Sequence, residues 1–238
     1  MRPIAPKIGF DRFIRLEWAT KALEVRAGLA EIDELEAILD EAHSGPAARK
    51  KTRTVLNRLW LEPRKNLEPF ALRAVELFQA APNTPPAILT WGMAIVTYPF
   101  FAKVAEIIGR LTSLQGDCTT AEVHRRMAEI YGEREGTRRM TNMVIQSLDN
   151  WVLIERQNKG KLVLRKQPIN IEQSSFVNWL VEACLLSSDR PIAIASLEAS
   201  PLNFPFYLGS SIPYILSESK TLEVRADGAG TQVVAIIS

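Results

Sequence analysis

The chain has 238 residues, of which 47% are hydrophobic and 24% charged, and a net charge of only +2. This composition excludes a disordered, collagen-like or coiled-coil chain, and the length suffices for one large or two small domains. Two cysteines and two histidines exclude a disulfide framework and leave too few ligands for a structural zinc. We therefore expect neither a metal nor a cofactor.

No feature of the sequence indicates export or a membrane span. Residues 1–10 lack the apolar run and the cleavage site of a secretory signal, so we expect a cytoplasmic protein. Residues 77–102 carry no charge, but their prolines and amides leave a continuous apolar core of about 16 residues, below the roughly 20 that a spanning helix needs. We interpret this stretch as a buried central helix and expect no membrane partner.

Charge is distributed unevenly along the chain. The net charge is −5 over residues 11–42, +6 over 49–65, +4 over 119–166 and −4 over 167–238. If both basic segments face one side of the fold, they form a positive surface that attracts phosphates. The alternative is that acidic segments pack beside the basic ones and cancel the field; we favour the shared surface.

Hydrophobic periodicity predicts that the first half is helical. We expect helices over residues 11–27, ended by Gly28, over 32–42, over 47–60 with Ser44 as the cap, and over 67–79 and 87–114 with an interruption near Tyr98 and Pro99. In the helix over 47–60 a basic face opposes the apolar stripe, and we assign phosphate contacts to Lys50, Arg53 and Arg58. A merely solvated face is the alternative.

The middle of the chain has the element order of a winged helix. Thr119 and Glu122 form a capping box that begins a helix, Gly132 ends it, a second helix covers residues 136–150, and a hairpin joins 151–154 to 162–164 around an Asn-Lys-Gly tip. With the helix before it, this is the order of the winged-helix variant of helix-turn-helix. We predict a mainly α fold with small β-hairpins, in which a helical N-terminal half precedes winged-helix modules.

The two faces of the helix over 136–150 have different predicted roles. The core face comprises Thr137, Met140, Val144, Ser147, Leu148 and Trp151. Arginine pairs with guanine, and asparagine or glutamine with adenine, so the opposite face and the hairpin are predicted to bind DNA. These residues are Arg138, Arg139, Asn142 and Gln146 on the helix and Arg156, Lys159 and Lys161 on the hairpin.

The last quarter of the chain is predicted to be a second, winged-helix-like unit. We expect helices over residues 174–186 and 210–217, then a hairpin formed by 222–225 and 232–237 around the tip at 227–230. The unit has no matching basic surface, so a packing or partner-binding role suits it better, and Cys184 is expected in the core. The predicted domains are residues 1–97, 98–168 and 169–238.

Two segments resemble a known family. Residues 44–59 (Ser-Gly-Pro-Ala-Ala-Arg-Lys-Lys-Thr-Arg-Thr-Val-Leu-Asn-Arg-Leu) are similar to the early Arg-rich helix of the BrxA family of bacteriophage-exclusion (BREX) systems. Residues 141–153 are similar to that family's helix leading into the wing, and the resemblance covers about residues 10–166. It implies a DNA-binding accessory protein of phage defence, with other defence proteins as partners.

Sequence motifs of catalysis are absent: the chain has no nucleotide-binding loop, nucleophile elbow, HExxH helix or CxxC pair. The leading hypothesis is therefore a non-enzymatic protein that binds double-stranded DNA. One alternative is a scaffold that docks a nuclease, methyltransferase or ATPase. A winged-helix transcriptional repressor ranks lower, because no dimerisation helix is evident, and the sequence does not predict the oligomeric state.

Overall fold

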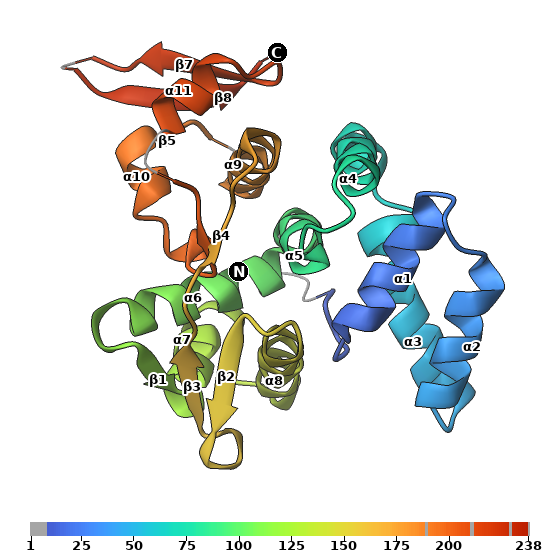
Figure 1. Ribbon diagram of the computed structural model, residues 1–238. Helices are drawn as coiled ribbons and strands as arrows, with labels where there is room; N and C mark the ends of the chain where they lie inside the picture. Colours follow the sequence, from blue (N-terminus) through green and yellow to red (C-terminus); the bar gives the residue numbers. More distant parts are fainter. Residues whose placement is uncertain (1–8, 189, 210–211, 229, 238) are drawn as a thin grey trace, which may run out of the picture.

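The computed structural model describes residues 9–188, 190–209, 212–228 and 230–237. Over these residues the fold is mainly α with three small β-sheets, which confirms the predicted fold class (Figure 1). The first eight residues, the expected helix start at Ser210 and the tip residue Ala229 lie outside the described residues.

The N-terminal half is helical, as predicted. Its helices are α1 (Leu16–Arg26), α2 (Ile32–Ala42), α3 (Pro46–Leu56) with a π-helical turn at Asn57–Leu61, a short 3-10 turn at Lys65–Leu67, α4 (Glu68–Ala80), α5 (Pro86–Thr97) and α6 (Pro99–Gln115). The predicted bounds of α2 agree with the observed ones. Gly28 ends the first helix with a positive φ of 71°, and its N–H reaches the Val25 carbonyl at 3.1 Å.

Two predicted helix starts in this half were wrong. Helix α1 begins at Leu16 rather than Asp11, because the preceding segment is extended and bound to a distant helix: the Ile14 N–H donates to Ser147 Oγ at 2.9 Å. Gly45, not Ser44, is the N-cap of α3. Pro46 occupies the first helical position, where it has no N–H that needs a hydroxyl acceptor.

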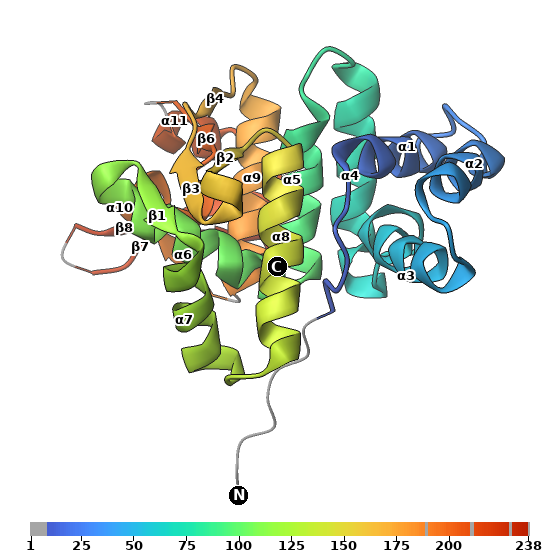
Figure 2. The ribbon, with the colours of Figure 1, turned by 90° about the horizontal axis from the view of Figure 1, so that it is seen from below.

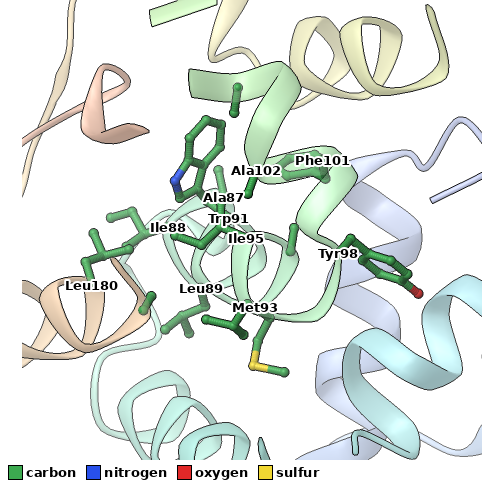
Figure 3. Packing of buried hydrophobic residues seen from close by; sticks show 14 of the residues in the cluster. Ala87, Ile88, Leu89, Trp91, Met93, Ile95, Tyr98, Phe101, Ala102 and Leu180 are labelled. Atoms are coloured by element: carbon green, nitrogen blue, oxygen red, sulfur yellow. The ribbon is translucent and has the colours of Figure 1, made fainter. Parts of the chain in front are cut away.

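Helix α5 is the central buried helix that the uncharged stretch predicts. Its residues from Ala87 to Thr97 are buried on every side, and Figure 3 shows Trp91 and Ile95 among side chains that include Phe101 of α6 and Leu180 of α9 (Ser174–Ser188). Among the described residues no single helix is long and apolar enough to span a membrane; α5 and α6 meet that criterion only as a pair, bent by 116°.

After α6 the chain forms a compact unit of helices and a three-stranded sheet. The elements are β1 (Asp117–Thr119), α7 (Thr120–Tyr131), α8 (Glu135–Asn150), β2 (Ile154–Gln157) and β3 (Leu162–Arg165), and the sheet order is β1-β3-β2. We call Pro99–Arg165 the α6–β3 unit. The predicted hairpin is present, but it starts at Ile154, because Val152 adopts a positive φ of 62° in the turn after α8. Strand β1 was not predicted.

The last quarter repeats this topology. After β4 (Ile169–Asn170) and α9 come β5 (Ile192–Ala193), α10 (Ile194–Glu198), a 3-10 turn at Pro201–Asn203, β6 (Phe206–Tyr207), α11 (Ile212–Ser217), β7 (Leu222–Ala226) and β8 (Gln232–Ile236). The order of the last sheet is β5-β8-β7, so here too the first strand pairs with the last. We call α9 to β8 the α9–β8 unit.

A single apolar core connects all these elements. Its buried members come from α1 through β8, and in Figure 1 α5 lies at the centre, between α4, α6 and α9. At the α5–α9 contact, Gly92 leaves room for Trp179, whose ring stacks on Phe70 at 4.4 Å between centroids. The domain boundaries predicted from sequence remain a prediction.

Candidate nucleic-acid interface

Helix α8 presents one face to the core and the other to solvent. All six residues predicted for its core face are buried, with at most 6% of their surface exposed. Trp151 also donates its Nε1–H to the Ile14 carbonyl at 2.9 Å, which fixes the C-terminal end of α8 against the N-terminal segment. The orientation of the helix is thereby set, and the opposite face, with Arg138 and Arg139 exposed and Asn142 half-buried, points outward.

A groove of about 530 Å³ lies between the start of α7, the outer face of α8 and the tip of the β2–β3 hairpin. We call it the α8 groove. It brings together six of the residues predicted to bind DNA, from two elements separated in sequence. They are Arg138, Asn142, Gln146, Arg156, Lys159 and Lys161. Arg139 is exposed on the same helix without lining the groove.

The hairpin tip is held against the start of α7. Thr120 donates its hydroxyl to the Gly160 carbonyl at 2.6 Å and its N–H to the Lys161 carbonyl at 2.9 Å. Asn158, Lys159 and Gly160 all have positive φ, which turns the chain tightly between the two strands. Lys159 and Lys161 are therefore held beside α7 and α8 at one end of the groove.

The predicted capping box is present at the N-terminus of α7. The Glu122 N–H donates to Thr119 Oγ1 at 3.2 Å, and the Thr119 N–H donates to Glu122 at 2.8 Å. The Thr119 hydroxyl also donates to the Glu122 carboxylate, at 2.7 Å. The two bonds that the carboxylate accepts from the Thr119 N–H and hydroxyl lower the pKa of Glu122, so it remains ionised. The capping box predicted where α7 begins. In the folded chain, the first residues of α7 form one wall of the groove.

The cations of the groove are not neutralised by carboxylates. Over the described ranges, the salt bridges involve none of the five basic residues predicted on α8 and the hairpin: Arg138, Arg139, Arg156, Lys159 and Lys161. The neighbouring cations on α7 differ, because Arg125 and Arg126 both pair with Glu129. Unpaired cations, half-buried amides and a helix start therefore line one concave surface.

Two groove residues have more restricted positions than the sequence indicates. Arg156 is half-buried, and its guanidinium lies so close to Gly160 that a Cβ there would be 2.3 Å from Nη2. Its position depends on this glycine. Asn142 bonds through Oδ1 to Nε2 of His124 on α7 at 3.0 Å. His124 also lines the groove, and no motif in the sequence singled it out.

The predicted phosphate contacts on α3 lie elsewhere. Lys50 and Arg58 are exposed, but Arg53 forms an ion pair with Glu36 of α2 and donates to Asn57 Oδ1 at 2.6 Å. Seen in Figure 2, α3 lies across the N-terminal segment from α8. The basic residues of α3 therefore form a surface separate from the groove, and α2 partly cancels its charge.

The described residues give no sign of a metal site or an activated nucleophile. No group of three or more histidine, cysteine or acidic side chains is placed to hold a metal ion among them. Both cysteines are buried, Cys184 in the core as expected. Burial raises the pKa of Cys118 and of Cys184 to about 12, so both are thiols at neutral pH.

Comparison with protein-family models, with curated proteins and with solved structures finds no match to this chain.

Proposed function

We propose that this protein binds double-stranded DNA without catalysing a reaction on it, and that the α6–β3 unit acts as a winged helix. In this proposal α8 enters the major groove and the β2–β3 hairpin contacts the flanking phosphates. The observation that carries it is the α8 groove, where unpaired cations from a helix and a hairpin line one concave surface. A basic helix exposed to solvent without a basic hairpin beside it would be weaker support for DNA binding.

The dimensions of α8 suit this role. A major groove about 12 Å wide admits one α-helix, and α8 is 16 residues long with one face outside the core. From Arg138 to Gln146 the helix rises about 12 Å at 1.5 Å per residue. That length corresponds to roughly three to four base pairs, so four polar side chains are spaced to contact successive bases or phosphates.

The surface of α3 supports a second, separate contact. Lys50 and Arg58 are exposed, and both remain predicted phosphate contacts on a duplex long enough to reach α3. Arg53 contributes less, because its charge is already paired with Glu36. Affinity therefore depends first on the α8 groove and second on α3.

Fluorescence anisotropy with a labelled duplex tests the proposal. We expect R138A/R139A to weaken binding at least tenfold at low salt, since two unpaired cations are lost. The matched control is R125A/R126A, which removes two arginines from α7, where Glu129 already offsets one of their two charges. Equal binding by R138A/R139A and the wild type, or equal losses in R138A/R139A and the control, would refute the outer face of α8 as the DNA site.

The wider role rests on the resemblance to the BrxA family, from which we propose an accessory function in phage defence alongside other defence proteins. A scaffold is the second candidate, favoured by the α9–β8 unit. There Tyr207 and Tyr214 are 54% and 65% exposed, and tyrosine is enriched in protein interfaces. Absence of any DNA binding at low salt, together with capture of a defence enzyme from nuclease-treated lysate, would favour the scaffold.

A further inference from the structure

The contact between His124 and Asn142 joins two helices inside the α8 groove. His124 lies on α7 and Asn142 on α8, both half-buried, with 3.0 Å between Nε2 and Oδ1. Because Oδ1 is an acceptor, the imidazole donates from Nε2 in this bond. Both residues also line the groove, so the bond orients an amide at the surface that faces DNA.

The bond changes the hydrogen-bonding capacity that the Asn142 amide offers to DNA. A carboxamide reads adenine with both of its groups, since the oxygen accepts from N6 and the nitrogen donates to N7. His124 occupies one of the two lone pairs of Oδ1, so Oδ1 is a weaker acceptor for adenine N6, while both N–H groups of the amide nitrogen remain free. These donors favour guanine, whose major-groove edge offers two acceptors, O6 and N7, over adenine, which offers N7 alone beside the N6 donor.

We propose that His124 is a positioning residue that makes Asn142 select guanine over adenine in the DNA bound by the α8 groove. This inference rests on the proposed function, because it concerns the same site. It also changes the role predicted for Asn142 from sequence alone, where asparagine was expected to pair with adenine.

Packing of the two helices does not need this polar contact. Both helices pack through the apolar core, to which α7 contributes Val123 and Met127 and α8 contributes Val144, each 0% exposed. The bond is also independent of protonation, because a neutral imidazole with its proton on Nε2 and an imidazolium both donate from that atom. Helix packing therefore does not require the His124–Asn142 bond, and the effect of that bond on the groove is to orient the Asn142 amide.

Selection of bound sequences from a random duplex library, at fixed low salt, tests the inference. We expect the wild type to enrich guanine at one position, and H124Q, whose amide nitrogen replaces the donor, to keep that preference. In H124L, which lacks a donor, the ratio of guanine to adenine enrichment should be about tenfold lower than in the wild type. N142A should lose base preference at this position while enrichment at other positions persists.

Each outcome separates the two proposals. A wild type that binds no duplex overturns the DNA-binding function and this inference with it. A wild type that binds and a folded H124L that keeps its guanine preference overturn the inference alone, as does H124Q behaving like H124L. If thermal melting shows that H124L is unfolded, N142A decides: an unchanged guanine preference in N142A refutes the assignment.

Discussion

Replacing both lysines of the hairpin tip, Lys159 and Lys161, with alanine should flatten the salt dependence of DNA binding. Both side chains line the α8 groove, and neither takes part in a salt bridge of the described chain. Each phosphate neutralised by a cation releases counterions, so every contact contributes to the slope of affinity against salt. The slope therefore counts the cations that touch DNA.

The magnitude follows from the number of unpaired cations. Each contact contributes about −0.9 to the slope of log affinity against log salt, so two lysines contribute about −1.8. Between 50 and 200 mM salt this amounts to about a 12-fold difference: the affinity of the variant should fall about 12-fold less than that of the wild type. All five unpaired cations of α8 and the hairpin would together contribute about −4.5.

Anisotropy titrations at four salt concentrations measure this slope for wild type, K159A/K161A and the control R125A/R126A. The control should change the slope less than the lysine variant, because Glu129 already offsets one of the two positive charges. An unchanged slope in K159A/K161A would show that the hairpin does not contact phosphate. A control that flattens the slope as much as the lysine variant would show that general charge, not the groove, determines binding.

Three further predictions concern the stability of the fold. Gly92→Ala should destabilise it by about 1–3 kcal/mol in urea unfolding, because the new Cβ would lie 2.1 Å from the Trp179 ring; no loss would mean that the ring moves freely. Arg73→Ala should cost about 3 kcal/mol in the same assay, since the side chain of its partner Glu182 is 6% exposed and would lose its counter-charge; adding Glu182→Gln should restore part of the loss. Burial lowers the pKa of His43 from its usual 6.5, so the unfolded chain binds the proton of this histidine more tightly than the folded chain does. As the pH is lowered through 6.5, the melting temperature of the wild type should therefore decrease more than that of H43Q.

Local patterns predicted the elements whose signals lie within one segment. The bounds of α2 follow from its apolar stripe, with Leu35 and Leu39 buried, and from the glycine and proline that come soon after it. The capping box at Thr119 predicted the start of α7 because both of its hydrogen bonds join residues three apart. The outward face of α8 was likewise predictable, because its periodicity assigns the buried side without knowledge of the neighbours.

The parts that the sequence did not predict depend on contacts between distant segments. Helix α1 starts late because Ile14 bonds to Ser147, 133 residues away. Arg53 was expected to be available for phosphate, but Glu36 of another helix pairs with it. The bond from His124 to Asn142 joins residues 18 apart on two helices, so the guanine preference that we propose for Asn142 has no signal in the sequence.

The two units of shared topology show why strand order alone does not determine function. In each, a helix, a strand, two helices and two strands follow in order, and the first strand of the sheet pairs with the last; the second unit adds a 3-10 turn and β6 between its helices. The α6–β3 unit has a 16-residue outer helix with unpaired cations. In the α9–β8 unit the corresponding α11 has six described residues, Ile212–Ser217, and Arg225 of the hairpin pairs with Glu223. Since phosphate attraction depends on unpaired charge, the larger set of unpaired cations on the first unit is the reason we propose that unit for DNA and the second for contact with protein.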